Sequence, residues 1–294
     1  MVISIDVGGT KTRWGVVSRS TRKVIATSVR PTEQRRSDIV PTLYSGGAEL
    51  LQSIGVDWRV VHQISIGVPG MVSTKGEIYN CPNAPEWENL DVSSLRENTG
   101  CSVRVVKDVN LAVMGEWNSQ HSIESDLVVI YVGTGIGMGA IVQGSPLLGA
   151  RGLAGEIGHW VVQADGEVCA CGNRGCLETV ASGSALEKAA TALGYEKETA
   201  VASLLKGWSS GEERAAAAVN SAIHHLGNTV ADLINLLDPV RIVLGGGVIE
   251  GTPELTGAIA SVARAHARSR RVTQTVIETS QLGNQAPLIG GIWA

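Results

Sequence analysis

The sequence lacks an extended run of basic residues, and this absence excludes the partners that such runs bind. The net charge is −4 at pH 7 with a pI near 5.9, and no run of Lys or Arg exceeds two residues apart from the short cluster at 268–271. Charge-driven binding to nucleic acid or to an anionic membrane needs Lys and Arg concentrated on one face. We therefore expect no nucleic-acid partner and no membrane partner.

We also expect no membrane span and no signal peptide. Residues 127–150 carry no charge, but six glycines interrupt them, and the apolar pieces around these glycines are typical of two strands joined by a turn. Asp6 and glycines follow directly after a five-residue opening, which leaves no room for the apolar region of a signal peptide. The chain has 294 residues, 44% of them hydrophobic, so we expect a cytoplasmic protein with two domains or lobes.

Cysteine is scarce, and most of it lies in one place. Four possible metal ligands fall within 18 residues: His159, Cys169, Cys171 and Cys176. Three thiolates and one imidazole are the number and type of ligands that a tetrahedral structural Zn²⁺ prefers, and Gly172 and Gly175 allow the tight folding that would bring them together. A disulfide or three unrelated thiols are the alternatives. Four protein ligands leave no open position for a reactive water, so we expect a structural metal.

Two similar strand-turn-strand patterns organise the chain. Residues 2–18 alternate apolar and polar positions around a Gly-Gly-Thr turn, and residues 126–142 repeat this plan. The repeat indicates a duplicated α/β lobe with a cleft between the copies. The remaining pattern alternates helices and strands, which is typical of α/β proteins. The expected elements are helices at 39–53 and 212–237, the second stopped by Asp238-Pro239, and strands at 63–68, 103–106 and 241–244.

Three glycine turns follow predicted strands, and each could bind part of a nucleotide. The first consists of Asp6, Gly8, Gly9, Thr10 and Lys11, the second of Gly133, Thr134 and Gly135, and the third of Gly245, Gly246 and Gly247. Glycine lets the backbone approach phosphate oxygens, Thr10 and Lys11 can donate to them, and Asp6 could hold Mg²⁺ through water. An ordinary hairpin turn is the alternative for each turn alone, but the three together indicate an ATP site with the third turn against the nucleoside.

The motifs as a set resemble those of the ROK family of sugar kinases and sugar-responsive repressors, within the actin-like ATPase superfamily. The resemblance covers essentially the whole chain and is carried by residues 6–11, 67–70, 82–83 with Trp87, 108–112, 133–135, 155–159, 176–178 and 245–247. It implies a two-lobed fold of ribonuclease H-like α/β domains with an interlobe cleft, usually dimeric, that phosphorylates a sugar hydroxyl with Mg·ATP. We expect a smaller lobe at 1–107, to which 281–294 returns, and a larger lobe at 108–280 with a zinc loop at 159–176.

The resemblance also assigns roles to single residues. It implies that Asp108 is the general base, although a helix N-cap is the alternative for this aspartate. Glu156, His159 and Glu178 are implied to bind the sugar, and the alternative for both glutamates is a surface carboxylate that accepts from loop amides. Since His159 needs one ring nitrogen for zinc, its other nitrogen stays available to the sugar. The same resemblance places Gly70 and Asn83 in the sugar pocket.

Lys107 departs from the family pattern, which commonly has Asn directly before the catalytic aspartate. An ammonium group only donates, whereas an amide both donates and accepts, so Lys107 could alter hydroxyl selectivity, favour an acceptor or an anionic group on the substrate, or point away from the sugar. It would repel a cationic amino group. Glucose as substrate is therefore open to question.

Three functions remain open from the sequence. The leading one is an ATP-dependent hexose kinase that acts on the 6-hydroxyl, with glucose as lead substrate. The second is a kinase for N-acetylmannosamine, fructose, an amino sugar or a C7 cyclitol, and polyphosphate is an alternative donor. The third is a non-catalytic sugar-binding regulator, which the presence of Asp6 and Asp108 disfavours. Repressors of the family carry a DNA-binding domain ahead of the core, and we expect none here because Asp6 stands close to the start.

Overall fold

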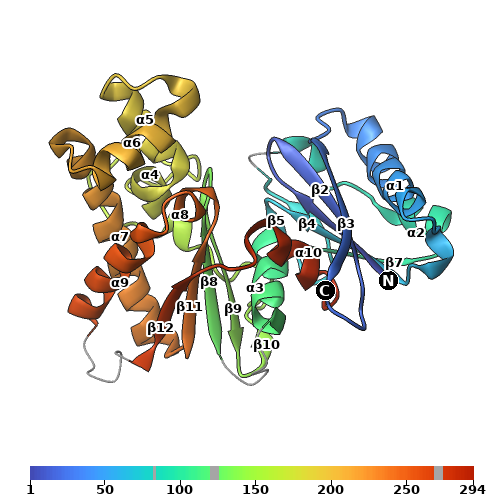
Figure 1. The fold of residues 1–294 in the computed structure, drawn as a ribbon. Coiled ribbons are helices and arrows are strands. Elements are labelled where there is room, and N and C mark those ends of the chain that lie inside the picture. The colour runs from blue at the N-terminus through green and yellow to red at the C-terminus, as the bar shows by residue number, and fades with distance from the viewer. Residues whose placement is uncertain (82–83, 120–125, 268–273) are drawn as a thin grey trace. The chain divides into compact units, whose positions relative to one another are not determined.

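The computed structural model describes residues 1–81, 84–119, 126–267 and 274–294, and its contacts divide the chain into two compact units (Figure 1). The first unit is Met1–Ile123 with Pro146–Ala154 and Asn284–Ala294, and the second is Glu124–Ser145 with Gly155–Gly283. The contacts thus group residues 108–123 with the N-terminal strands. From the sequence we instead expected the smaller lobe to end at residue 107. The domain limits stay a prediction.

A five-stranded sheet forms the frame of the first unit, in the order β3-β2-β1-β4-β7. β1 pairs antiparallel with β2 and parallel with β4, and β4 pairs parallel with β7. The strands are β1 (Val2–Val7), β2 (Lys11–Val17), β3 (Val24–Pro31), β4 (Gln63–Val68) and β7 (Ser102–Lys107), and a small hairpin follows β4 as β5 (Met71–Val72) and β6 (Ile78–Tyr79).

Helices cover both faces of this sheet because apolar residues alternate along β1. Ile3 and Ile5 enter the larger core, where Trp14 also lies, and α1 packs against β2 and β3 on that side. Val2 lies in a smaller cluster with Leu288 of α10, and α3 packs against β4 and β7. The helices are α1 (Arg36–Ser53), α2 (Ser93–Thr99), α3 (Asp108–Ser119) and α10 (Ala286–Gly290), with short 3₁₀ turns η1 (Trp58–Val60) and η2 (Pro85–Trp87).

The C-terminal segment packs into the first unit through three glycines that leave no room for a side chain. A Cβ on Gly290 would lie 1.8 Å from the carbonyl oxygen of Leu111, and a Cβ on Gly115 would lie 2.0 Å from that of Ala286. A Cβ on Gly291 would lie 2.0 Å from Oγ of Ser4 on β1, and the Gly291 carbonyl accepts from the hydroxyl of Ser65 at 2.6 Å. Gly290 and Gly115 thus place backbone against backbone between α3 and α10, and Gly291 places the chain end against the sheet.

The second unit repeats the sheet plan of the first. Its strand order is β10-β9-β8-β11-β12, with β8 antiparallel to β9, parallel to β11, and β11 parallel to β12. The strands are β8 (Leu127–Val132), β9 (Ile136–Val142), β10 (Ser145–Pro146), β11 (Arg241–Gly245) and β12 (Val276–Thr279). Both predicted glycine hairpins are therefore present, and the expected duplication is confirmed.

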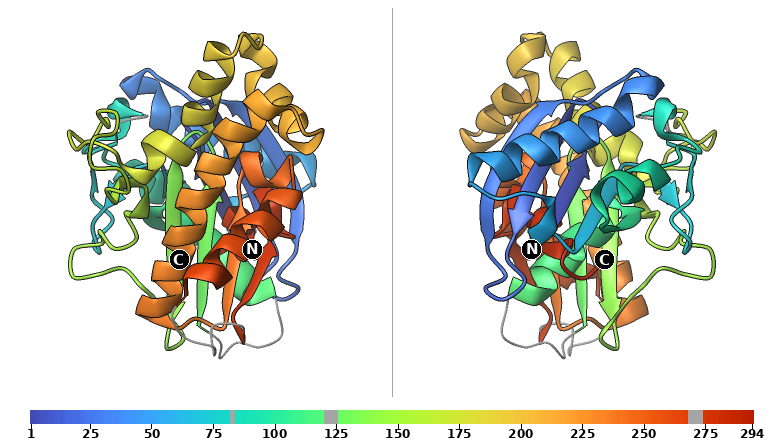
Figure 2. Two further views of the ribbon diagram at one scale, coloured as in Figure 1. Left: turned by 90° about the vertical axis from the view of Figure 1, so that its left-hand side faces the viewer. Right: turned by 90° about the vertical axis from the view of Figure 1, so that its right-hand side faces the viewer.

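Six α-helices of the second unit lie among its described residues, and the longest ends where the sequence predicted. α7 stops at Asp238, which adopts the left-handed conformation with φ 46° before Pro239. α7 and α9 run side by side (Figure 2) and approach closely at Gly227, where a Cβ would lie 2.5 Å from Cβ of Val262. The elements are α4 (Leu177–Ala181), α5 (Gly183–Ala192), α6 (Ala200–Ser209), α7 (Glu213–Leu237), α8 (Gly247–Glu250) and α9 (Glu254–His266), with η3 (Ile157–His159) and η4 (Lys197–Thr199). The 3₁₀ turn η6 (Gly283–Gln285) leads from the second unit into the last segment of the first.

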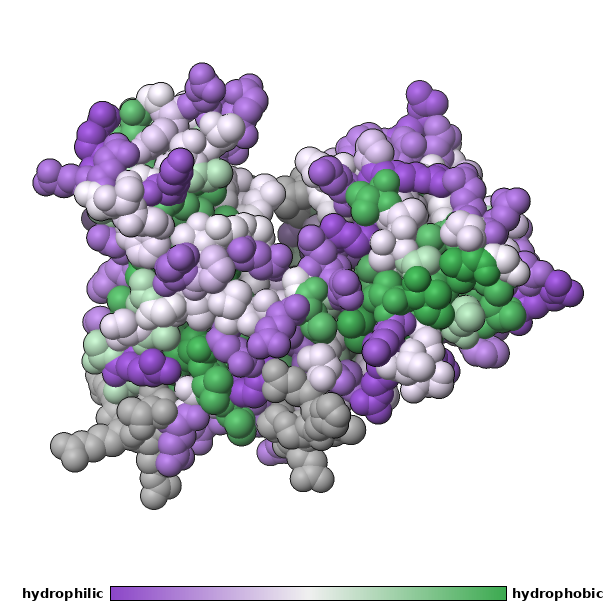
Figure 3. Space-filling model, in the orientation of Figure 1, coloured by the Kyte–Doolittle hydropathy of each residue, from purple (hydrophilic) through white to green (hydrophobic). Residues whose placement is uncertain are grey.

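The visible surface is mostly hydrophilic, with an apolar area over β2 and β3 of the first unit (Figure 3). The large apolar side chains exposed in this unit include Ile25 and Val29 on β3, together with Val60 and Trp293. Among the described residues, no helix has the length and apolar character of a membrane span.

Candidate active site

The carboxyl ends of three parallel strands bring several predicted residues of the first unit to one edge of its sheet. β1 ends beside Asp6 and Gly8, β4 ends before Gly70, and β7 ends before Asp108. Asp6 lies opposite Gly67 in the register of β1 and β4, and a Cβ on Gly67 would lie 3.1 Å from Cα of Asp108. Gly67 therefore lets the start of α3 approach the strand that neighbours Asp6.

The first glycine turn is fixed through its carbonyl groups, whereas N–H groups of the turn stay open to a ligand. Gly8 N–H donates to the carbonyl of Lys11 at 2.9 Å, and a Cβ on Gly8 would lie 2.9 Å from that oxygen. Thr32 donates its hydroxyl to the Gly8 carbonyl at 2.6 Å and its N–H to the Thr10 carbonyl at 3.0 Å. The N–H groups of Gly9 and Thr10 donate to no described residue, and the side chains of Thr10 and Lys11 are exposed. An anion could accept from all four groups.

Asp6 carries a carboxylate whose burial makes ionisation costly. Its side chain is 21% exposed, and Oδ2 lies 3.3 Å from Nη1 of Arg13, which stands directly opposite on β2. Desolvation raises the pKa of Asp6 to about 6, and Arg13 opposes this shift. A divalent cation beside Asp6 would offset the cost of burying the charge, so the site fits the predicted role in holding Mg²⁺.

Asp108 is the first residue of α3, and its carboxylate is bound to the helix start. Oδ1 accepts from the N–H of Val109 at 2.7 Å. One carboxylate oxygen of Asp108 therefore binds an N–H group at the helix start, as the helix-capping alternative expected. The helix dipole favours the ionised carboxylate at this position. Lys107, the last residue of β7, is only 7% exposed and therefore does not extend into solvent.

Gly70 lies against Cys81, which is a buried thiol. A Cβ on Gly70 would lie 2.9 Å from Sγ of Cys81, and this thiol donates to the carbonyl of Pro69 at 3.3 Å. Desolvation, followed by the negative charges of Asp108 and Glu88, raises the pKa of Cys81 to about 11. Cys101 is also buried, and neither of these two thiols forms a disulfide. Asn83 lies outside the described residues.

In the second unit the four predicted metal ligands converge. The ligand atoms of His159, Cys169, Cys171 and Cys176 all lie within 4.8 Å of one another. Sγ of Cys171 and Sγ of Cys176 are 3.6 Å apart, as are Sγ of Cys169 and Nδ1 of His159. Two sulfurs on one tetrahedral Zn²⁺ with bonds of about 2.3 Å stand about 3.8 Å apart, so the cluster has the size for this ion. All five cysteines are free, which removes the disulfide alternative.

The thiols and glycines of the cluster fit a cation as well. Desolvation, together with hydrogen bonds from Cys171 and Cys169, raises the pKa of Cys176 to about 12. Three thiolates cannot share this space without positive charge, which a Zn²⁺ ion would supply. A Cβ on Gly175 would lie 1.6 Å from the carbonyl oxygen of Gln163, and Gly172 has φ +92°, so both glycines are required for the loop.

The cluster orients His159 toward Glu156. Nδ1 of His159 faces Cys169, while Nε2 lies 4.0 Å from Oε2 of Glu156 at the start of η3. The two side chains are 32% and 29% exposed. Nδ1 thus points at the thiols, and Nε2 points at the carboxylate. Sugar binding by the pair stays a prediction.

Glu178 follows the last cysteine of the cluster and braces the second glycine turn. Its Oε2 accepts from the N–H of Ile136 at 2.9 Å, and a Cβ on Gly135 would lie 2.3 Å from this oxygen. Glu178 therefore accepts from a loop amide through one of its two oxygens, as the alternative to sugar binding expected. Oε1 has no hydrogen-bond partner within the described part of the chain.

The second turn itself is fixed through its carbonyls. Gly183 and Ser184, at the start of α5, donate to the carbonyls of Gly133 and Thr134 at 2.7 and 3.2 Å. The N–H groups of Thr134 and Gly135 donate to nothing in the ranges that the structure describes, and the Cβ position of Gly133 meets no atom within 4 Å. The turn therefore presents free N–H groups, as the first turn does.

The third turn lies beside the end of β8, because β8 and β11 are parallel and Gly245 stands opposite Tyr131. A Cβ on Gly245 would lie 2.2 Å from the Tyr131 ring, and Gly246 has φ +88° with the Val132 carbonyl 2.5 Å from its Cβ position. Gly247, in contrast, faces open space. The first two glycines are thus needed for packing, and the third leaves a surface open to a ligand.

Three residues near these turns were not identified from the sequence. Arg13 could have been found, because the predicted hairpin register places it opposite Asp6. Glu250 could also have been found, because it follows Gly246 by four residues and can therefore reach back to it across one helical turn. Thr32 carries no local signal, because its contact with Gly8 depends on how β3 packs beside β2.

Comparison with known proteins places the chain among sugar kinases and related regulators. A model of the ROK family matches residues 2–294. A glucokinase of Halalkalibacterium halodurans is 30% identical over 99% of this chain and 93% of its own length, and a kanosamine kinase of Amycolatopsis mediterranei is 30% identical over 99% and 94%. The N-acetylglucosamine repressor of Escherichia coli O157:H7 is 30% identical over 90% of this chain and 68% of its own length.

Solved structures agree with this placement. The ROK family glucokinase of Streptomyces griseus, in complex with glucose and AMPPNP, has a TM-score of 0.82 and 29% identity, and the match covers 99% of this chain and 97% of that one. The ROK hexokinase of Thermus thermophilus has a TM-score of 0.84 and 30% identity, covering 99% and 96%. The expected α/β fold of the actin-like ATPases is therefore confirmed.

Proposed function

Since the chain belongs to the ROK family, we propose that it is a sugar kinase, which transfers a phosphoryl group from Mg·ATP to a hydroxyl of a hexose. The observation that carries the proposal is the pair of glycine turns, one in each unit, whose N–H groups have no acceptor among the described residues. A sugar-binding regulator would not need such groups, whereas a kinase needs them for the donor's phosphates.

The donor is bound mainly by backbone groups in this proposal. The N–H groups of Gly9 and Thr10, the Thr10 hydroxyl and the Lys11 ammonium donate to phosphate oxygens, and Thr134 and Gly135 supply the second set. Asp6 would hold Mg²⁺ through water, and this ion supplies charge neutralisation of the phosphates when bound. Gly245, Gly246 and Gly247 would receive the nucleoside.

Asp108 acts as the base on the sugar hydroxyl. The hydroxyl oxygen forms the new bond to the γ-phosphorus, the bond from this phosphorus to the bridging oxygen of ADP breaks, and the hydroxyl proton passes to Asp108. The start of α3 stabilises the carboxylate before the transfer, and most of the acceleration comes from positioning and charge stabilisation.

The sugar is oriented by Glu156, His159 and Glu178, with Gly70 and Asn83 lining its pocket. The zinc cluster supports the first three, because His159 is itself a ligand and Glu178 follows Cys176 by two residues. Zn²⁺ held by His159, Cys169, Cys171 and Cys176 would be structural, since four protein ligands leave no position for substrate. We further propose a homodimer, which sedimentation would test.

Glucose and its 6-hydroxyl are the lead substrate and position. The relatives include a glucokinase, but also a kinase named for the amino sugar kanosamine, so similarity alone does not select glucose. Lys107 would repel a cationic amino group and favours a neutral or anionic substrate. N-acetylmannosamine, fructose and a C7 cyclitol are the further candidates, with polyphosphate as the alternative donor.

The test is ADP release by purified, zinc-loaded protein with Mg·ATP against hexoses, acetylated and free amino sugars, and cyclitols. We expect turnover with one neutral sugar well above that with free amino sugars. A folded protein that binds a sugar but turns over none of the panel, with either ATP or polyphosphate, would contradict the kinase and favour the regulator.

A further inference from the structure

Glu250 makes an unassigned contact with the third glycine turn. Its Oε1 accepts from the N–H of Gly246 at 3.0 Å, across one turn of α8. Gly246 has φ +88° and lies against the carbonyl of Val132, so its N–H has a fixed direction. This contact resembles a helix-capping interaction, in which a glutamate reaches back to the N–H at the start of its own helix. It leaves the open face of Gly247 untouched.

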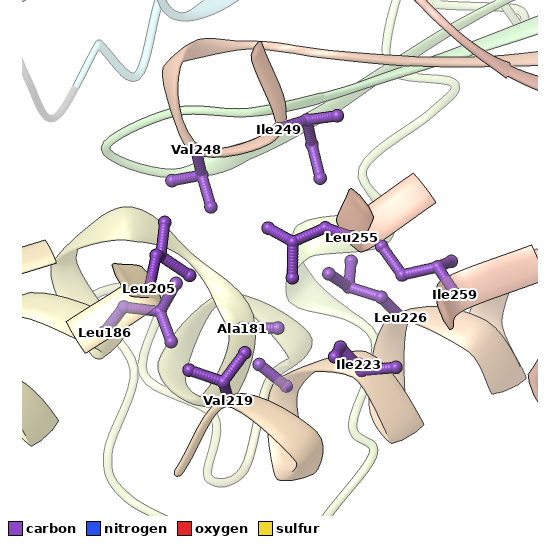
Figure 4. A pocket seen from close by; sticks show the side chains of 11 residues that line it. Ala181, Leu186, Leu205, Val219, Ile223, Leu226, Val248, Ile249, Leu255 and Ile259 are labelled. Carbon is purple, nitrogen blue, oxygen red and sulfur yellow. The ribbon is translucent and has the colours of Figure 1, made fainter. Parts of the chain in front are cut away.

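Apolar packing holds the other side of α8. Val248 and Ile249 point into a layer of apolar side chains from α4, α5, α6, α7 and α9 (Figure 4). The cavity in this layer has a volume of about 10 Å³, about what a single water molecule needs. The layer is therefore a packed core and not a ligand site. Val248 and Ile249 fix the position of α8, and Glu250 fixes the turn that precedes it.

The other carboxylate oxygen of Glu250 faces the segment after β12. Oε2 lies 3.1 Å from the Cβ position of Gly283, which has φ +49°. Gly283 donates its own N–H to the hydroxyl of Ser280 at 2.9 Å, and Ser280 donates its N–H to the carbonyl of Leu244 at 2.7 Å. A side chain at 283 would thus push against Glu250, and the absence of one lets the carboxylate stay beneath the turn.

We propose that Glu250 is a positioning residue for the nucleoside end of the donor, acting through the Gly246 N–H. This inference rests on the proposed function, because it assigns the third turn to the nucleotide. Glu178 shows the same arrangement at the second turn, where a carboxylate accepts from the Ile136 N–H beside a glycine that lacks room for Cβ. Removal of the Glu250 carboxylate leaves the Gly246 N–H without its acceptor and lets the turn move, so nucleotide affinity falls while sugar affinity does not.

The experiment compares E250Q and E250L in the zinc-loaded, full-length protein. Gln keeps a carbonyl oxygen that can accept from Gly246, and Leu does not. E254Q and E254L are the matched controls, because Glu254 is an exposed glutamate of α9 that makes no hydrogen bond to a described residue. Calorimetry with Mg·AMPPNP measures nucleotide affinity, steady-state kinetics gives KM for each substrate, and amide hydrogen exchange follows residues 245–248. E250D replaces E250L if the leucine variant does not fold.

We expect E250L to weaken Mg·AMPPNP binding about tenfold and to speed exchange at 246–248, with sugar KM and Tm nearly unchanged. E250Q should recover most of the affinity, and both Glu254 variants should behave as wild type. Equal losses in E250Q and E250L would overturn the hydrogen-bond role, and parallel losses of sugar affinity, nucleotide affinity and Tm would show a merely structural residue.

Failure of the proposed function would look different. A wild-type protein that binds no nucleotide removes both the kinase and the nucleotide role of Glu250, even where exchange at 246–248 still responds to E250L. Unchanged nucleotide affinity in E250L, with a wild type that binds Mg·AMPPNP, overturns the role of Glu250 alone.

Discussion

The two units share one strand plan but support their glycine turns in different ways. In the first unit the turn after β1 is held by the neutral hydroxyl and N–H of Thr32, while the charged pair Asp6 and Arg13 lies beside it. In the second unit a carboxylate braces each of the two turns, Glu178 at Ile136 and Glu250 at Gly246. The common topology therefore sets where turns occur, and the side chains around each turn decide its charge.

The contrast has a chemical meaning under the proposed function. The first unit keeps its carboxylates, Asp6 and Asp108, at a strand end and a helix start, where a metal ion and a hydroxyl could reach them. The second unit uses one oxygen each of Glu178 and Glu250 to hold backbone in place, leaves Glu156 and the other oxygen of Glu178 for the sugar, and adds the zinc cluster as a further support. Variants that act on one unit and spare the other can test this division.

The largest effect is expected for Gly290→Ala in the first unit. The new Cβ would lie 1.8 Å from the Leu111 carbonyl oxygen, so α10 must leave α3 or the backbone must move, at a cost of about 4 kcal/mol or more. Gly257→Ala is the control in α9 of the second unit, where nothing lies within 4 Å, and should stabilise by about 1 kcal/mol. Urea unfolding measures both, and a Gly290→Ala variant as stable as wild type would contradict the close packing.

Asp108→Asn should reduce kcat by roughly 10²–10⁴-fold, because the amide cannot take the hydroxyl proton. The amide oxygen can still accept from Val109, so the helix start and the Tm should change little. Binding of Mg·AMPPNP, measured by calorimetry, should be retained. Full turnover in this variant would remove Asp108 as the base.

Removal of the metal should act on the second unit. Cys176→Ser, or zinc removal by a chelator, should abolish zinc binding and destabilise the protein by about 3 kcal/mol, because the cluster orients His159 and the start of α4. Cys101→Ser is the control, since this buried thiol of the first unit donates to the Val61 carbonyl and a hydroxyl can do the same. Metal analysis and thermal unfolding measure the difference, and an unchanged Tm without zinc would refute the structural role.

Asp6→Asn should separate stability from activity in the first unit. The folded-state pKa of Asp6 is about 6 against an ordinary 3.8, so its ionisation disfavours the folded state. The contribution of Asp6 to the free energy of unfolding is therefore fully present below pH 3.8 and is lost as the pH rises through 6, by at most about 3 kcal/mol. At pH 8 the variant should be the more stable protein and should be inactive, and the gap in stability should close between pH 6 and pH 4. Urea unfolding across this range checks the sign.

Lys107→Asn should have the smallest effect, a change in preference among sugars. The amide both donates and accepts and carries no charge. Compared with the wild-type protein, kcat/KM for free amino sugars should therefore rise several-fold, and kcat/KM for glucose should rise as well. Unchanged ratios across the panel would show that Lys107 does not contact the sugar.

Much of the fold and part of the site could be predicted from local sequence. The hairpins around residues 8–11 and 133–135, the end of α7 at Asp238, and the convergence of His159 with Cys169, Cys171 and Cys176 are all set by spacing and turn chemistry within short segments. Glycine, proline and alternating apolar residues act on the backbone nearby, so one sequence suffices to find them.

The rest depended on contacts between distant segments. The sequence does not show that Thr32 holds Gly8, that Glu178 accepts from Ile136, or that Gly290 packs on Leu111, since these pairs are brought together only when strands and helices pack. The residues within a turn determine its conformation, because the backbone angles of a residue depend mainly on that residue and its neighbours in the chain. Which carboxylate braces the turn, and which stays open to a ligand, is decided by side-chain packing across the whole unit.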